Sequence, residues 1–260
     1  MKQKALLLAG LMGLACVAAP QQKSADWVQV AADPVVIAKR AQDMYKNFVG
    51  VHPGKGVFGK AKLNGKTPSA ADPLGYGYLS NQPLNVYFWS PKKFQISYLV
   101  YGKIPSQEFI WSDGAGKMMR LGPFVGEKNK IFSIKQHLFD VKSDEELVEK
   151  WPIDFTKYLY SPFFSGNATL TRYVAALKRG VGGYKVTVWT RGNPDEYRIF
   201  ATREKSGKRP ASTVEMIFMD AKPYLPVIIH TTYGQLYDLI WRMGWYNDWP
   251  LPASPSTIKD

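Results

Sequence analysis

The spacing that comes nearest to a catalytic motif is Ser90-Pro91-Lys92-Lys93, which fits the pattern S-x-x-K. In serine–lysine acylases the serine nucleophile begins a helix, so that the lysine lies one turn away. Here the motif stands between two segments that alternate like strands, and Pro91 suits the second position of a turn. The pattern therefore predicts a hairpin turn, with hydrolysis by Ser90 and Lys93 as the alternative.

Other chemistry-bearing patterns do not occur in the sequence. The three histidines, His52, His137 and His230, lie far apart and on different expected elements. No pair of histidines or cysteines has metal-ligand spacing, and there is no G-x-S-x-G, phosphate-binding glycine loop or H-E-x-x-H. We therefore expect a protein that is not an enzyme and that needs no metal or cofactor.

Residues 1–20 read as a secretory signal peptide. Lys2 and Lys4 form a basic start, and the apolar run over 5–19 is too short to span a bilayer. Small residues close the run. The signal indicates export, and it leaves 21–260 as the mature chain.

Two processing routes are open. Cleavage after Ala19 would leave Pro20 directly behind the cut. Cys16, which follows Leu14-Ala15 as at the end of a bacterial lipobox, instead suggests lipidation of that cysteine. Cys16 is the only cysteine, so we expect a mature domain without a disulfide.

The composition is that of a globular protein, with 45% hydrophobic and 21% charged residues among 260. The formal net charge of +13 falls to +11 when Lys2 and Lys4 leave with the signal peptide. Such a charge favours anionic partners such as lipid headgroups or cell-wall polymers, and export argues against nucleic acid. Because the lysines and arginines form no dense run, a solvated basic surface is the interpretation that we prefer.

Strands must position any site. Residues 84–121 read as four short strands of aromatic and β-branched residues, with turns at Ser90-Pro91, at 102–105 and at Asp113-Gly114. Further strands are expected over 56–63, 169–177, 184–190, 197–203, 213–219, 226–232 and 235–243, and the ambiguous stretch 122–142 allows one more over 130–134. Ten or eleven antiparallel strands in one domain are expected.

The first of these four strands is apolar on both faces. Val86 and Phe88 point one way while Tyr87 and Trp89 point the other, because side chains alternate along a strand. A sheet that is apolar on both faces needs a cover on each. One of those covers can be a ligand.

A first helix is expected over 33–50. Asp33-Pro34 supplies an N-cap and a proline in the first turn, and Gly50 ends the helix. A single apolar stripe runs along it, formed by Ile37, Ala41, Met44 and Phe48. This stripe predicts that the helix packs against the sheet.

Two short amphipathic helices are expected later in the chain, joined at Pro152. Ser143 begins a capping box in which Glu146 returns a hydrogen bond to the Ser143 N–H. The apolar residues of the two pieces are Leu147, Val148 and Trp151, then Phe155 and Leu159. The pair fits a lid over an apolar cavity, and it fits equally a plug in a closed core.

These pieces, in this order, resemble the LolA-like periplasmic lipoprotein carriers. The resemblance rests on the signal peptide, the first helix, the helical interruption near 143–160 and three strand motifs. The motifs are the turn Trp89-Ser90-Pro91-Lys92-Lys93-Phe94, the hairpin Trp111-Ser112-Asp113-Gly114, and the strand pair from Glu215-Met216-Ile217-Phe218 to Leu225-Pro226-Val227-Ile228.

The resemblance implies a mainly β (α+β) fold, an incomplete and strongly curved antiparallel β-barrel whose mouth is closed by helices. It implies a periplasmic protein that binds acylated lipid or lipoprotein without catalysis, with a membrane protein or an anionic membrane surface as partner. The residues expected to line the cavity are Phe88, Phe94, Ile96, Tyr98, Phe109, Trp111, Val186, Val188, Met216 and Phe218, with Leu147, Trp151 and Phe155 on the lid. The alternative is that all of them are core.

A second function class remains open, an envelope sensor or scaffold that binds a protein partner. It predicts a filled interior and an exposed apolar patch around Trp241, Trp245 and Trp249. The same tryptophans also fit an ordinary closing strand.

Overall fold

The computed structural model describes residues 26–58, 82–90, 92–100, 106–121, 130–133, 140–149, 166–219, 224–234, 237–254 and 256–258. The expected signal peptide with Cys16, and the lid residues Trp151 and Phe155, lie outside the described residues.

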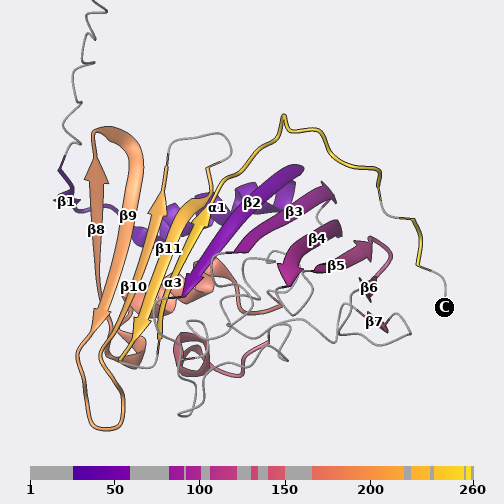
Figure 1. Cartoon of the computed structure of the whole chain (residues 1–260). Helices are drawn as coiled ribbons and strands as arrows, with labels where there is room; N and C mark the ends of the chain where they lie inside the picture. Colours follow the sequence, from indigo (N-terminus) through magenta and orange to yellow (C-terminus); the bar gives the residue numbers. More distant parts are fainter. Residues whose placement is uncertain are drawn as a thin grey trace, which may run out of the picture.

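The described residues form a twelve-stranded antiparallel sheet with few helices, which confirms the expected α+β class. The strand order is β1-β8-β9-β10-β11-β12-β2-β3-β4-β5-β6-β7, and the strand direction turns between β8 and β5 (Figure 1). The bounds are β1 (Val28–Val30), β2 (Gly50–Phe58), β3 (Gln82–Ser90), β4 (Lys93–Val100), β5 (Ser106–Asp113), β6 (Lys117–Leu121), β7 (Lys130–Ser133), β8 (Lys185–Arg191), β9 (Asn193–Arg203), β10 (Ser212–Phe218), β11 (Pro226–Tyr233) and β12 (Tyr237–Met243).

Two meanders make up this sheet. Strands β2 to β7 pair with their neighbours in sequence, and so do strands β8 to β12. The meanders join where β12 pairs with β2, and β1 adds to the outer edge of β8. Within the described residues the order begins at β1 and ends at β7, so these two strands form the edges.

Burial alternates along β10. In β10, Val214, Met216 and Phe218 are buried, while Glu215 and Ile217 between them are only partly covered. The buried set faces the helices, because an antiparallel sheet with helices on one side buries every second residue there. Figure 1 shows both long helices on the same side of the sheet.

Helix α1 (Pro34–Asn47) confirms the first expected helix. The Asp33 carboxylate accepts a hydrogen bond from Val35 N at 2.8 Å, and Pro34 occupies the first turn. Ile37 and Ala41 of the expected stripe are buried among the core side chains.

Helix α3 (Leu170–Lys178) corrects the strand expected over 169–177. Thr169 Oγ1 accepts from Arg172 N at 3.2 Å and caps the helix. The buried residues, among them Leu170, Tyr173, Val174 and Leu177, have helical spacing. The β-branched and aromatic residues of this segment suggested a strand, and the cap and the 3.6-residue period decide otherwise.

The two helices pack side by side on the sheet. Gln42 Oε1 of α1 accepts from Thr171 N of α3 at 2.9 Å. At the other end of the pair, Lys178 Nζ donates to Asp33 Oδ2 at 2.8 Å. These contacts fix α3 against α1, and α3 in turn positions the site.

Two strands begin earlier than expected, and one strand was not expected. The strand expected over 56–63 begins at Gly50 as β2, and the strand expected over 197–203 begins at Asn193 as β9. β1 is not among the expected strands. Its three residues are too few to show a pattern in sequence.

The segment after β12 runs along strand ends (Figure 1). Val51 N donates to Tyr246 O at 2.7 Å, and Tyr246 N donates to Val51 O at 2.8 Å. Further along, Trp89 Nε1 donates to Pro252 O at 3.3 Å, and Ile258 N donates to Asp113 Oδ2 at 3.3 Å. The segment therefore contacts β2, β3 and β5 in turn.

Replacing Gly50 with alanine is expected to lower the free energy of unfolding by about 2 kcal/mol. Gly50 has φ +154°, and a Cβ there would lie 2.1 Å from Tyr246 O, so the terminal segment would have to move. Urea unfolding of the mature chain measures the effect. Gly116→Ala is the control, because φ is +99° there and no atom lies within 4 Å of a Cβ. Equal losses in the two variants would show that the contact with Tyr246 is unimportant.

Candidate ligand-binding face and its cover

Most of the described side chains expected to line a cavity come together in one buried hydrophobic cluster, called the core cluster below. Its members from the prediction are Phe88, Phe94, Ile96, Leu147, Val188, Met216 and Phe218. Val186 is partly buried and packs against it. The side chain of Tyr98 lies outside the description. The core cluster also contains residues of α1 and α3, so the helices cover these positions.

Strand register explains why residues from separate strands meet. Phe88 of β3 lies opposite Phe94 of β4, and Ile96 of β4 lies opposite Ile110 of β5. Paired residues in antiparallel strands share one face of the sheet. The face toward the helices is therefore continuous across the meander.

The same register corrects the placement of Phe109 and Trp111. Both alternate with Ile110 and Ser112, which are buried on the helix side, so Phe109 and Trp111 lie on the opposite face and are only partly covered. The pairing of β4 with β5 decides which face each residue takes. The sequence of one strand alone does not show which residues pair across the two strands.

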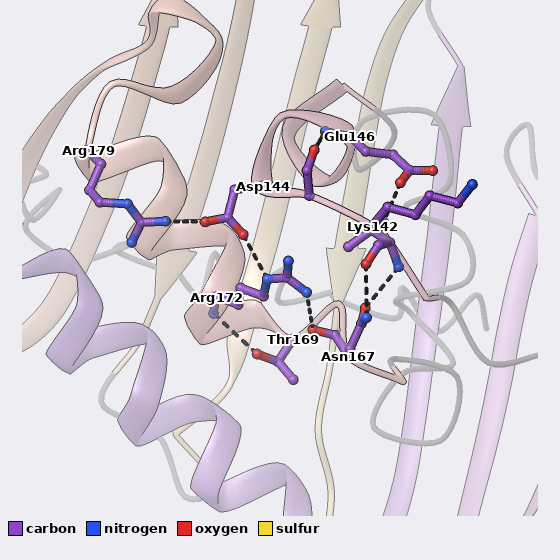
Figure 2. Close-up of polar contacts among 9 residues, drawn as sticks. Lys142, Asp144, Glu146, Asn167, Thr169, Arg172 and Arg179 are labelled. Carbon is purple, nitrogen blue, oxygen red and sulfur yellow. Dashed lines mark hydrogen bonds and ion pairs between the residues drawn. The ribbon is translucent and has the colours of Figure 1, made fainter.

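A helix whose described residues are 144–149, called the cover helix below, contributes two fully buried side chains, Leu147 and Val148. Ser143 Oγ accepts from Glu146 N at 3.2 Å, as expected of an N-cap. Glu146 Oε2 accepts from Lys142 N at 2.6 Å, so its carboxylate reaches the residue before the expected partner Ser143 (Figure 2). The loop before Ser143 brings the Lys142 N–H within reach.

The start of the cover helix is attached to α3 by charge. Asp144 Oδ1 accepts from Arg172 Nε at 2.8 Å, and Asp144 Oδ2 pairs with Arg179 (Figure 2). Arg172 also donates from Nη1 to Asn167 O at 3.2 Å. One carboxylate thus holds two arginines, one in α3 and one just after it.

Asn167 ties the preceding loop to the same place. Its amide donates to Val141 O and accepts from Val141 N, both at 2.9 Å (Figure 2). Asp140 Oδ1 accepts from Asn167 N at 2.7 Å. The loop that leads into the cover helix is therefore fixed by backbone-like hydrogen bonds.

The last described residue of the cover helix reaches the sheet. Glu149 Oε1 accepts from Arg203 Nη1 at 2.6 Å, and Tyr233 OH donates to Glu149 Oε2 at 3.1 Å. The guanidinium of Arg203 lies 4.9 Å from the ring centre of Tyr184 and 5.4 Å from that of Tyr233. Tyr184 OH donates to Ser212 Oγ at 2.7 Å.

Opposing influences act on the pKa values in this group. Burial lowers the pKa of Arg203, but Tyr184, Glu149 and Tyr233 together raise it above its ordinary value. Burial raises the pKa of Tyr233, and the Glu149 carboxylate raises it further. Arg203 therefore stays charged and the tyrosine stays neutral at any physiological pH.

A buried histidine, which the sequence pattern did not single out as a site residue, lies near α1. His52 of β2 stacks on Trp245 with ring centres 4.1 Å apart, and neither of its ring nitrogens has a hydrogen-bond partner. Burial lowers the pKa of His52 to about 3, so the ring is neutral. A lone histidine on a strand gives no sequence signal of this environment.

The tryptophans expected in one exposed patch are separated. Trp245 is buried and donates from Nε1 to Pro226 O at 2.8 Å. Trp249 is 56% exposed, and its ring centre lies 5.6 Å from that of Tyr246, which is 40% exposed. The side chain of Trp241 lies outside the description. Among the side chains that the structure describes, Tyr246 and Trp249 form an exposed aromatic pair.

The S-x-x-K motif lies in the hairpin between β3 and β4, which confirms the expected turn. Ser90 Oγ accepts from Lys92 N at 3.4 Å and from Lys93 N at 3.2 Å. The hydroxyl thus caps the turn.

Among the described residues, no group of three or more His, Cys, Asp or Glu side chains is placed to hold a metal ion. No helix in the described part of the chain is long and apolar enough to cross a membrane. The chain matches no family model, and a search of curated proteins finds no match.

Proposed function

We propose that this chain is a periplasmic protein that binds the acyl chains of a lipid or a lipidated protein without catalysis, in envelope lipoprotein sorting. In this proposal the sheet is an incomplete, strongly curved barrel. Its helix-facing side is the binding face, and the cover helix is part of the lid.

One observation carries the proposal. The core cluster spans both meanders, with Phe94 from one and Met216 from the other, and the cover helix adds Leu147 and Val148 to it. Polar contacts attach that helix at both ends of its described part, through Asp144 and Glu149. An apolar face under a cover held by exchangeable ion pairs suits a ligand that must enter and leave.

The energies are compatible with such an exchange. Uncovering Leu147 and Val148 costs about 1.5–3 kcal/mol for each side chain that loses its burial. Binding of an acyl chain gains about 0.8 kcal/mol of favourable free energy for each methylene removed from water. About four to eight methylenes therefore offset the removal of the cover helix, and common acyl chains are longer than that.

The charge of the mature chain suits the setting. A formal charge of +11 after loss of the two signal-peptide lysines favours an anionic membrane surface or an anionic headgroup. A carrier would also need an inner- or outer-membrane protein as partner.

Lipid extraction tests the proposal. The mature chain from residue 21, purified without detergent, is expected to carry about one acyl lipid per protein, because the binding face supplies apolar contact without a covalent step. Mass spectrometry of the organic extract measures it, and a sample unfolded and washed in urea is the control. A stable folded preparation free of lipid would contradict the proposal.

A lipid-free preparation would favour the second candidate, a sensor or scaffold that binds a protein. The observation in its favour is the exposed pair Tyr246 and Trp249 on the segment that follows β12. Exposed aromatic pairs of this kind are common in protein interfaces.

A further inference from the structure

Packing does not explain one feature of the group around Arg203. Its side chain is 2% exposed, and its Nη2 is buried with no hydrogen-bond partner. The other guanidinium nitrogens are used, Nη1 by Glu149 at 2.6 Å and Gly182 O at 3.4 Å, and Nε by Pro210 O at 3.3 Å. A buried N–H without an acceptor is costly, so an additional acceptor would be stabilised here.

The guanidinium of Arg203 already binds one anion, which belongs to the protein itself. The Glu149 carboxylate takes hydrogen bonds from Arg203 and Tyr233, and Arg209 Nε lies 3.7 Å from its Oε1. Two guanidinium groups thus face one carboxylate and leave an excess of one positive charge. Planar guanidinium donors match carboxylate and phosphate oxygens.

The site extends from the interior to the protein surface. Exposure rises from 2% at Arg203 to 29% at Glu149 and 52% at Arg209. An anion that approaches from solvent therefore contacts Arg209 first. Further inside, it reaches the guanidinium of Arg203, which is now hydrogen-bonded to Glu149.

We propose that Arg203, Arg209 and Tyr233 form a site for the carboxylate or phosphate headgroup of an acyl ligand, which replaces the Glu149 carboxylate on Arg203. This inference rests on the proposed function, since it names the headgroup class of the same ligand. Glu149 belongs to the cover helix. When the headgroup displaces the Glu149 carboxylate from Arg203, this part of the helix is no longer held to β9. Headgroup binding and uncovering of the apolar face then occur together.

Glu149→Gln tests this exchange, because it keeps the size of the side chain and removes the competing charge. Dodecyl phosphate is expected to bind this variant at least tenfold more tightly than it binds the unmodified chain. Neutral monododecanoyl glycerol is expected to bind both within twofold. Calorimetric titration of the lipid-stripped mature chain measures both ligands.

Glu145→Gln is the matched control. Glu145 is exposed in the same helix, and its replacement removes the same charge away from Arg203. Its affinity for dodecyl phosphate is expected to equal that of the unmodified chain. An equal gain in Glu145→Gln and Glu149→Gln would overturn the site, because net charge alone would explain it.

A second variant tests the role of Arg203 directly, and it is needed if Glu149→Gln alone disturbs the helix. The double variant Glu149→Gln/Arg203→Met retains the charge balance of the pair and is expected to lose the preference for phosphate over the neutral lipid. A preference that persists would overturn the role of Arg203.

Two further outcomes show whether acyl-chain binding fails or only the assignment of the site to a lipid headgroup fails. Failure of both amphiphiles to bind any variant would remove the acyl-binding proposal and the headgroup site with it. Inorganic phosphate that binds Glu149→Gln as tightly as dodecyl phosphate would support the anion site and overturn its assignment to a lipid headgroup.

Discussion

Replacing Phe94 with alanine is expected to lower the free energy of unfolding by about 3–5 kcal/mol. Phe94 is fully buried, lies opposite Phe88 and Ser112 on the neighbouring strands, and belongs to the core cluster. The loss combines the transfer of a large aromatic side chain to water with the cavity that it leaves. Urea unfolding followed by circular dichroism measures the change.

Phe109→Ala is the matched control. It removes the same side chain from the neighbouring strand, but on the opposite face, where Phe109 is only partly covered. Its expected loss is about 1 kcal/mol. Equal losses at Phe94 and Phe109 would contradict the assignment of the two faces.

Acidification is expected to remove about 3 kcal/mol of stability through His52 between pH 8 and pH 4. Burial lowers the pKa of His52 from 6.5 to about 3 in the folded chain. Between these values the unfolded chain binds a proton that the folded chain does not, so stability is complete above about pH 6.5 and falls as the pH drops toward 3. Urea unfolding at stepped pH values measures the slope.

The variant His52→Phe isolates this contribution from that of the carboxyl groups. Phenylalanine keeps a ring to stack on Trp245 and removes two ring nitrogens that have no hydrogen-bond partner. The variant is expected to be at least as stable at pH 8 and to lose about 3 kcal/mol less on going to pH 4. Identical pH slopes in the two proteins would show that His52 does not titrate as described.

The elements that could be predicted from sequence are those with a local signal. The segment 84–121 alternates in polarity and carries turn residues at its breaks, and its strands appear as expected. Helix α1 has an N-cap and an apolar stripe within its own residues. Helix α3 has the same features, but the β propensity of Thr171, Tyr173 and Val174 concealed them.

The candidate site could be predicted only in part, because it depends on pairing between distant strands. The aromatic residues of β3 and β4 could be assigned to faces by alternation, whereas the face of Phe109 and Trp111 follows from register. The contact between Glu149 and Arg203 joins residues 54 positions apart, and no pattern in either segment indicates it. The lack of a hydrogen-bond partner at Arg203 Nη2 is likewise a property of the folded chain alone.

The pairing of β12 with β2 has a consequence for how the chain assembles. Each meander consists of strands adjacent in sequence, so each can form early, whereas the β2–β12 ladder brings Phe58 to Leu239 and pays a large loop-closure entropy. Until that ladder forms, β2 is an open edge, where a second chain could add.

The sequence of β2 suits this temporary exposure. It contains Pro53, Gly54, Lys55 and Gly56, residue types that natural edge strands use to discourage aggregation. β2 is thus an interior strand with the composition of an edge. Its protection against aggregation is needed while the chain folds and no longer needed once β12 has docked.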